Sequence, residues 1–390
     1  MVKVTSAAVL GLLLAGIVLL DAVQDRPALK DVFKDAFVMG TAVNAAIVSG
    51  TDGGSRDLVL RHFSSITAEN VMKAGPLNPK PGVWNFGPAD AFVDFGEKHG
   101  MFIVGHTLVW HNQTPDWFFR DETGQPNSPS AQIERMRAHI EAVAGRYKGR
   151  VQAWDVVNEV IDNDGSYRRT TWVNAVGNGD ELIKAAFRFA SQYAVGAELY
   201  YNDFNAWRPA KRDGIVRIVK MLKAEGIRID GIGMQGHWGL NYPKPEYIEA
   251  AIDAYAALGV KVMITELDVD VLPLTREGQV IGTVMSDPQF QLEEFKAYLD
   301  PYRDGLPEAV EQQVTARWAE LFRIFQARRD KIDRVTLWGA HDGLSWKNNY
   351  PVPGRTNYPL LFGRAGQPKR AFDAVVAMPA GVGPRGTFGR

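Results

Sequence analysis

The chain has 390 residues, of which 46% are apolar and 23% charged, and its formal net charge is -1. This balance argues against a polyanionic partner such as nucleic acid and favours a neutral ligand. The sequence contains no cysteine, which excludes disulfides, thiolate metal sites and lipid attachment to a cysteine.

Residues 1–24 are typical of an export signal. Lys3 supplies the positive charge, and residues 7–20 (AAVLGLLLAGIVLL) form an apolar stretch that is too short to span a bilayer comfortably. The segment 20–22 (LDA) has a small residue at one end only, so an uncleaved anchor stays open. We expect an exported protein, periplasmic or extracellular, with no other membrane partner and with its catalytic domain in residues 25–378.

After the signal, apolar strand-like runs alternate with amphipathic helix-like stretches. The eight candidate strands are 36–42, 63–68, 102–108, 151–157, 198–202, 229–235, 260–265 and 334–338. The candidate helices are 88–99, 131–147, 180–195, 211–225, 244–258, 308–332 and 368–378, and only the first crossover, near 56–62, looks short. Eight strand–helix units in one series predict a single (β/α)8 barrel, with a doubly wound sheet as the alternative.

Two of these strands end on a glutamate: the run VQAWDVVNE ends at Glu159 and the run VKVMITE at Glu266. In a barrel the chemistry lies at the carboxyl ends of the strands, so both carboxylates are expected in one site. Hydrolysis of a glycosidic bond needs such a pair, one group to protonate the leaving oxygen and one to attack the sugar. A retaining enzyme holds them about 5 to 5.5 Å apart, where their repulsion is roughly 3 kcal/mol, or about two pKa units. One carboxyl is therefore expected to keep its proton at neutral pH.

The other predicted strand ends are rich in polar and aromatic side chains, unlike ends that only close a core. They are Asn44, Glu69, Asn70, Lys73, His106, Trp110, His111, Asn158, Asn202, Asp203, Gln235, His237, Trp238, Asp268 and Trp338. Recognition of sugar hydroxyls needs pre-aligned donors and acceptors of this kind, because an unmatched buried polar group costs roughly 1 to 3 kcal/mol.

Seven segments, in order along the chain, resemble glycoside hydrolase family 10, whose typical activity is endo-1,4-β-xylanase. They are ITAENVMK (66–73), GHTLVWHNQTPDW (105–117), WDVVNE (154–159), YYNDFN (200–205), GIGMQGHW (231–238), ITELDV (264–269) and TLWGAHDGLSW (336–346). The resemblance implies Glu159 as acid/base and Glu266 as nucleophile. It also implies a sugar site lined by Glu69, Asn70, Lys73, His106, Trp110, Asn158, Gln235, His237, Trp338 and Trp346.

The resemblance and the neighbouring residues together assign the proton to Glu159 and the ionised form to Glu266. His237 can donate to Glu266, and Asp268 can orient His237. Once Glu266 becomes a glycosyl ester its charge disappears, so the pKa of Glu159 is expected to fall. The acid of the first step then becomes the base of the second. Asn158 can bond the sugar 2-hydroxyl.

Three alternatives stay open from the sequence. A zinc hydrolase would draw on His106, His111, His237 and His341, although no His-x-His or His-Glu-x-x-His spacing occurs. A non-catalytic sugar-binding barrel is expected to lack one of the two glutamates, and this chain has both. A β-1,4-glucanase would use the same carboxylate pair, and the loop that would reject the extra hydroxymethyl group is not readable from the sequence.

Some stretches lie outside these patterns. The connection 271–307 is longer than a barrel loop needs, and we hypothesise that it overhangs one end of the cleft and restricts substrate binding. Arg355 could meet a uronic acid on decorated xylan, with a solvated loop charge as the default. Trp318 lies in helical register with apolar neighbours, which indicates core packing. Residues 379–390 are expected to form a flexible tail.

The sequence therefore predicts a retaining endo-1,4-β-xylanase without cofactor or bound metal. It would hydrolyse internal bonds of xylan or xylo-oligosaccharides by double displacement through a covalent glycosyl-enzyme. We expect the protein to act as a monomer.

Overall fold

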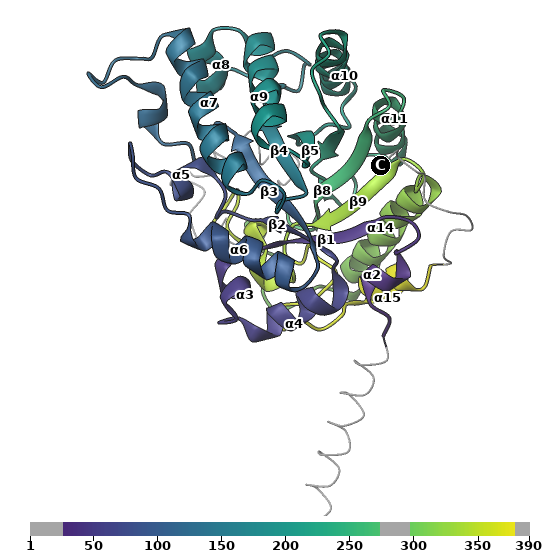
Figure 1. Cartoon of the computed structure of the whole chain (residues 1–390). Helices are drawn as coiled ribbons and strands as arrows, with labels where there is room; N and C mark the ends of the chain where they lie inside the picture. The colour runs from purple at the N-terminus through teal and green to yellow at the C-terminus, as the bar shows by residue number, and fades with distance from the viewer. Residues whose placement is uncertain (1–25, 274–296, 379–390) are drawn as a thin grey trace, which may run out of the picture.

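The computed structural model describes residues 26–273 and 297–378 (Figure 1). The expected export signal at 1–24, most of the connection 271–307 and the tail at 379–390 lie outside this part. Within it, no helix is both long enough and apolar enough to cross a bilayer.

Eight parallel strands form a closed barrel. They are β1 (Val38–Val43), β2 (Ser65–Ala68), β3 (Phe102–Val109), β4 (Ala153–Asn158), β5 (Glu198–Asp203), β6 (Gly231–Met234), β8 (Lys261–Asp270) and β9 (Ile332–Leu337). Each strand pairs with the next around the ring, and the pairing of β1 with β9 closes it. The predicted barrel is confirmed, and the doubly wound sheet, which would have open edges, is wrong. A short strand that was not predicted, β7 (His237–Gly239), pairs with the end of β8.

Helices surround the barrel (Figure 1). They are α2 (Leu29–Val32), α3 (Ala45–Ser49), α4 (Gly53–His62), α5 (Ala74–Leu77), α6 (Gly87–Lys98), α7 (Pro129–Arg146), α8 (Thr171–Val176), α9 (Gly179–Tyr193), α10 (Pro209–Ala224), α11 (Pro245–Ala256), α14 (Glu308–Ala327) and α15 (Arg370–Val376). All seven predicted helices are present, but the one predicted to reach residue 332 ends at Ala327, because β9 begins at Ile332. The first crossover is a helix of 10 residues.

Side-chain caps explain where two of the long helices begin. The Ser128 side chain accepts a hydrogen bond from the amide of Ala131 at the start of α7, and the Asn178 side chain accepts from two amides at the start of α9. These bonds satisfy amides that have no partner within the helix. Apolar helix faces then pack on the strands, and Trp318 of α14 is fully buried beside Phe322, which confirms its predicted place in the core.

The barrel interior is filled at one end and polar at the other. Val104, Ala153, Tyr200 and Met263 form a separate buried cluster inside the ring. The guanidinium of Arg334 stacks over Tyr200, with 5.4 Å between its central carbon and the ring centre. The filled end supports the barrel and leaves the carboxyl ends of the strands for polar side chains.

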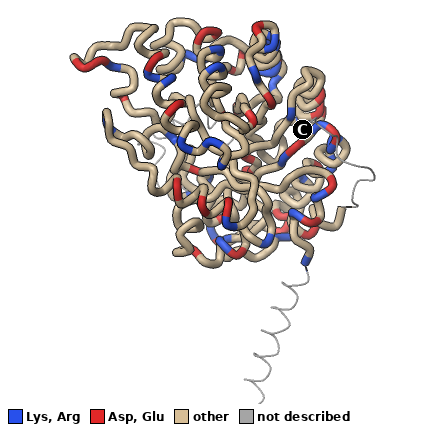
Figure 2. Tube along the Cα trace, viewed as in Figure 1, with Lys and Arg blue, Asp and Glu red and all other residues tan. Residues whose placement is uncertain are grey.

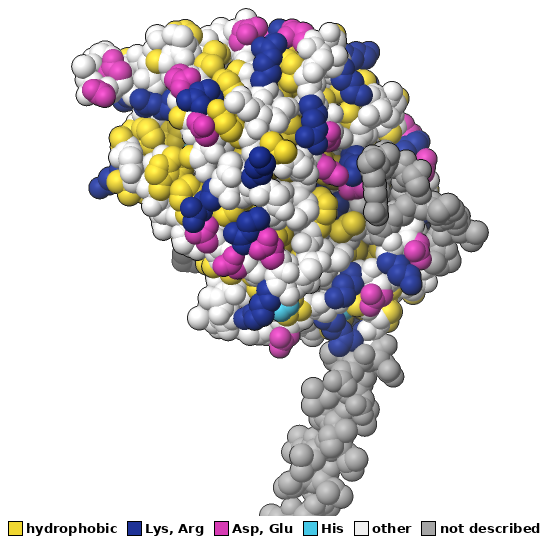
Figure 3. All heavy atoms as spheres, in the orientation of Figure 1, with side chains coloured by type: hydrophobic (Ala, Val, Ile, Leu, Met, Phe, Trp, Pro, Cys, Tyr) yellow, Lys and Arg dark blue, Asp and Glu magenta, His cyan; other side chains and the backbone are white. Residues whose placement is uncertain are grey.

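Charged side chains of both signs are interspersed along the chain (Figure 2). On the face shown in Figure 3, charged, polar and hydrophobic side chains are likewise mixed. The exposed large hydrophobic side chains of the described part are Val83, Trp84, Val195, Tyr247 and Tyr298. This distribution matches the near-zero net charge and presents no one-sign surface on the face shown.

Candidate active site

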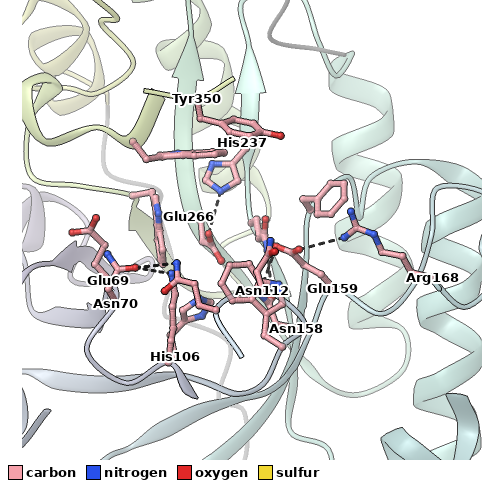
Figure 4. A pocket seen from close by; sticks show the side chains of 17 residues that line it. Glu69, Asn70, His106, Asn112, Asn158, Glu159, Arg168, His237, Glu266 and Tyr350 are labelled. Atoms are coloured by element: carbon pink, nitrogen blue, oxygen red, sulfur yellow. Dashed lines mark hydrogen bonds and ion pairs between the residues drawn. The ribbon is translucent and has the colours of Figure 1, made fainter. Parts of the chain in front are cut away.

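A single pocket at the carboxyl ends of the strands brings the predicted site residues together (Figure 4). Its lining contains both glutamates and every predicted sugar-binding residue: Glu69, Asn70, Lys73, His106, Trp110, Asn158, Glu159, Gln235, His237, Glu266, Trp338 and Trp346. It also contains Asn112, Gln113, Arg168, Phe204 and Tyr350, none of which was predicted there. Asp268 lies behind the lining, in contact with His237.

Glu266 is held from two sides. It lies inside β8, where the pairing with β9 shifts register between Ile264 and Leu267, and such a bulge re-aims side chains. Its side chain is 7% exposed. Oε1 accepts a hydrogen bond from Asn202 Nδ2 at 2.8 Å, and Oε2 accepts one from His237 Nε2 at 3.1 Å. Both carboxylate oxygens are therefore oriented by buried donors.

His237 bridges two carboxylates. Its Nδ1 lies 2.9 Å from Asp268 Oδ2, and its Nε2 faces Glu266. Burial lowers the pKa of His237, but the charges and hydrogen bonds of Asp268 and Glu266 outweigh burial and raise it to about 9. At neutral pH the ring is an imidazolium that donates to both. The indole of Trp346 also donates to Asp268 Oδ2, at 2.9 Å, so the predicted orienting contact of Asp268 is present within a larger network.

Glu159 is held in an uncommon backbone conformation. Its φ is 62°, in the left-handed region, and its amide donates to Asn202 O at 3.0 Å. Oε1 accepts from Gln235 Nε2 at 3.0 Å, and Oε2 lies 3.4 Å from Arg168 Nη1 (Figure 4). The side chain is 12% exposed, so Glu159 is not a solvated loop carboxylate.

The charge state of Glu159 differs from the expectation. Burial raises the pKa of Glu159, but the hydrogen bond from Gln235, the nearby His111 and Trp110 and the Arg168 cation together lower it below its usual range. The predicted proton at neutral pH is therefore wrong for this arrangement. The sequence did not show that Gln235 donates to Glu159, which is the largest lowering effect, or that Arg168 in the loop after β4 adds a cation.

On the side of the pocket formed by the segments that follow β2 and β3, polar side chains form pre-aligned pairs. Lys73 is buried, donates to Asn70 Oδ1 at 3.0 Å and lies 4.9 Å from the ring centre of Trp110. Burial lowers the pKa of Lys73, opposed by the charges of the surrounding glutamates. Burial raises the pKa of Glu69.

Two further contacts order this wall and the floor of the pocket. His106 Nδ1 lies 2.8 Å from Asp155 Oδ2, which fixes the ring orientation. The amide of Asn158 lies 3.1 Å from Asn202 Nδ2 and 3.3 Å from Gln235 Nε2. Asn158 is thus part of the amide network that connects the two glutamates.

Aromatic rings complete the pocket. Trp338 meets His106 edge to face, with ring centres 5.4 Å apart, and Trp346 stacks on Tyr350 at 5.0 Å. Phe204 follows the end of β5 in the YYNDFN segment, so its place at a strand end was a signal that the prediction overlooked. Flat rings at these positions suit the apolar faces of pyranose sugars.

Arg355, in contrast, does not reach the pocket. It is 4% exposed, and its guanidinium donates to the backbone oxygens of Pro273, Leu299 and Tyr350. The predicted contact with a uronic acid is therefore wrong, and so is the default of a solvated charge. Arg355 ties the segments on either side of residues 274–296 to the loop after β9.

The histidines considered for zinc are separated by their partners. Within residues 26–273 and 297–378, no group of three or more His, Asp or Glu side chains is arranged to hold a metal ion. His106 pairs with Asp155, and His341 Nε2 lies 2.9 Å from Ser55 Oγ. His237 bridges two carboxylates, whereas the buried Nδ1 of His111 has no hydrogen-bond partner within the described residues.

Comparison with known proteins decides the family. The sequence profile described as "Glycosyl hydrolase family 10" matches residues 28–378. The chain belongs to this family. Among curated relatives of this family 10 chain, Endo-1,4-beta-xylanase A of Xylanibacter ruminicola is 42% identical over 341 residues, covering 87% of this chain and 90% of the relative. Endo-1,4-beta-xylanase of Geobacillus stearothermophilus is 40% identical over 353 residues, covering 90% and 98%.

Solved structures agree. A family 10 endoxylanase retrieved from a sugarcane soil metagenome superimposes with a TM-score of 0.82 at 43% identity, covering 90% of this chain and 99% of the other. A mutant structure in complex with xylotriose gives a TM-score of 0.79 at 36% identity, covering 90% and 100%. The predicted family and barrel are confirmed, and the chain is a glycoside hydrolase.

Proposed function

We propose that this family 10 enzyme is a retaining endo-1,4-β-xylanase, with Glu266 as nucleophile and Glu159 as acid/base. The observation that carries the proposal is the presence of two buried carboxylates in one pocket, each held by a different set of partners. The xylanase names of relatives that align along most of this chain, and the xylotriose bound to a structural relative, support xylan as the substrate.

In the first step, Glu266 attacks the anomeric carbon while Glu159 protonates the departing oxygen. Asn202 and the His237 imidazolium orient the attacking carboxylate, and His237 stabilises its charge until the ester forms. Asn158 can bond the 2-hydroxyl of the reacting sugar, an interaction that strengthens toward the oxocarbenium ion. In the second step, Glu159 accepts a proton from water, which attacks the same carbon and releases Glu266.

Glu159 needs a proton for the first step, although Arg168 favours its ionised form. Arg168 Nη1 is 3.4 Å from Glu159 Oε2, and its side chain is 29% exposed. A leaving sugar that reaches Oε2 competes with Arg168 for that oxygen and excludes water from it. Both effects raise the pKa of Glu159 toward the protonated form that the leaving oxygen requires.

The decisive experiment compares reducing-sugar release from glucuronoxylan and from carboxymethylcellulose, with Glu266→Ala as the blank. We expect release from xylan only, lost in the variant. Equal or greater release from cellulose would make the enzyme a β-1,4-glucanase with the same mechanism. Binding of xylan without turnover by the wild type would make it a sugar-binding barrel. Proton NMR of the first products tests retention, which requires the β-anomer to appear before mutarotation.

We also propose that the protein is exported and acts as a monomer. The apolar stretch at 7–20 behind Lys3 supports export. N-terminal sequencing of the protein recovered from culture medium and from periplasm would show in which compartment the mature protein lies and where the signal is cleaved. An intact N-terminus in the membrane fraction would indicate an uncleaved anchor. Light scattering in solution would test the monomer.

A further inference from the structure

A buried ion pair lies beneath the pocket and takes no part in the mechanism above. Lys211 Nζ, at the beginning of α10, is 2.7 Å from Asp203 Oδ1, at the end of β5, and both side chains are fully buried. Neither residue lines the pocket. Burying two charges costs solvation that their attraction repays only in good geometry, so such a pair is weak evidence for stability alone.

Tyr201 connects this ion pair to the backbone beside Glu159. Its Oη donates to Asp203 Oδ2 at 2.5 Å. The same oxygen accepts from the amides of Val160, at 3.3 Å, and Ile161, at 3.1 Å. A phenol O–H is both a donor and an acceptor. Because its proton is committed to the carboxylate, the oxygen accepts from the two amides that follow Glu159.

Glu159 is the residue that benefits from this support. Its left-handed φ of 62° is rare for a residue with a side chain and persists only when the surroundings hold it. Its own amide is held by Asn202 O. Three consecutive amides, at 159, 160 and 161, are therefore fixed by neighbouring residues of β5.

We infer that Tyr201, Asp203 and Lys211 are positioning residues that aim the Glu159 carboxyl at the glycosidic oxygen. The inference rests on the proposed acid/base role of Glu159. Lys211 holds Asp203, Asp203 takes the phenol proton, and the phenol oxygen fixes the turn. Without the phenol oxygen the turn can relax toward an ordinary backbone conformation, which moves the carboxyl away from the leaving oxygen. A displacement of about 1 Å at such a group can cost up to about a hundredfold in rate.

Tyr201→Phe removes only the phenol oxygen, and Tyr255→Phe is its matched control. Tyr255 is equally buried, and its Oη donates to the Ala206 carbonyl at 2.7 Å, in the loop that follows β5. Glu159→Ala is the reference for a missing acid/base. Each protein is assayed on xylan, whose leaving alcohol needs a proton, and on 2,4-dinitrophenyl xylobioside, whose leaving group departs without one. Both assays are repeated with sodium azide.

For Tyr201→Phe, kcat/KM on xylan is expected to fall by about tenfold to a hundredfold. Glycosylation by the dinitrophenyl substrate is expected to be nearly unchanged, so the slow step becomes hydrolysis of the glycosyl-enzyme. Azide then raises turnover, because it attacks the anomeric carbon without a base. A C–N bond forms, the ester bond to Glu266 breaks with its electron pair returning to the carboxylate, and β-xylobiosyl azide is released. Tyr255→Phe is expected to show neither effect.

An equal loss on both substrates without azide rescue, or behaviour like that of Tyr255→Phe, would overturn the inference. If Tyr201→Phe does not fold, Asp203→Asn takes its place, with the same expected pattern and the same refuting outcomes. Its rates are then normalised to the fraction of protein whose thermal unfolding matches that of wild type. If Glu159→Ala itself shows neither leaving-group dependence nor azide rescue, the proposed role of Glu159 fails instead. The two failures are therefore distinguishable.

Discussion

Replacing Asp268 by asparagine should lower the pKa of His237 and destabilise the fold in a defined pH window. The pKa of His237 is raised from 6.5 to about 9, against burial, by Asp268 first and Glu266 second. At about 1.4 kcal/mol per pKa unit, the raised value corresponds to about 3 kcal/mol of folding free energy. Because Asp268 makes the larger favourable contribution, Asp268→Asn is expected to lose about 2 kcal/mol of this.

The raised pKa of His237 determines how the stability of the fold changes with pH. A group whose pKa is raised in the folded state adds stability that is complete below its unfolded pKa and is lost as the pH rises through its folded pKa. The difference in unfolding free energy between wild type and Asp268→Asn should therefore be largest below pH 6.5 and be lost as the pH rises through 9. Urea unfolding across this range measures it, and NMR titration of the His237 ring measures the pKa directly.

Asp300→Asn is the matched control for this experiment. Asp300 is also buried, but the groups that donate to it within the described residues are the Thr356 amide, at 2.7 Å, and Arg303, and neither is a histidine. Its stability loss should be the same at every pH in the range. A stability difference for Asp268→Asn that is equally flat, or a His237 ring that titrates near 9 in that variant, would refute the reasoning.

Three further predictions concern groups at and beyond the pocket. Arg168→Met removes the cation beside Glu159, so the pKa of Glu159 should rise. The basic limb of the kcat/KM profile on xylan, whose leaving alcohol needs a proton, should then move to higher pH, and a downward movement would contradict the assignment. Deletion of residues 274–296, bridged by a short glycine linker, should change the product pattern on long xylan if the connection 271–307 overhangs the cleft, and an unchanged pattern would end that hypothesis. Arg355→Met should remove a donor from the buried Leu299 carbonyl, at about 1 to 3 kcal/mol, and from two partly buried carbonyls, and so lower the thermal midpoint. The ratio of KM on glucuronoxylan to KM on undecorated xylan should stay constant.

The barrel and the positions of the two carboxylates could be predicted from the sequence because both depend on local patterns. Each strand contains an apolar run of its own; Glu159 directly follows β4, and Glu266 follows the apolar first half of β8. The path of a long loop has no comparable periodicity, so the return of Arg168 to Glu159 and the burial of Arg355 were not predictable from spacing. The end of β8 was also missed, because the strand continues past Glu266 to Asp270 through a change of register with β9.

The two glutamates are best distinguished by how replaceable their partners are. Glu266 is held by Asn202, which is fully buried, and by His237, which Asp268 fixes from behind. None of these donors can leave without breaking the pocket, so the orientation of Glu266 is permanent. Glu159 Oε2 faces the guanidinium of Arg168, whose side chain is 29% exposed and therefore less confined than the buried partners of Glu266. In the proposed mechanism the nucleophile needs a constant environment and the acid that becomes a base needs one that changes. The partners of Glu266 and of Glu159, drawn in Figure 4, differ in this sense.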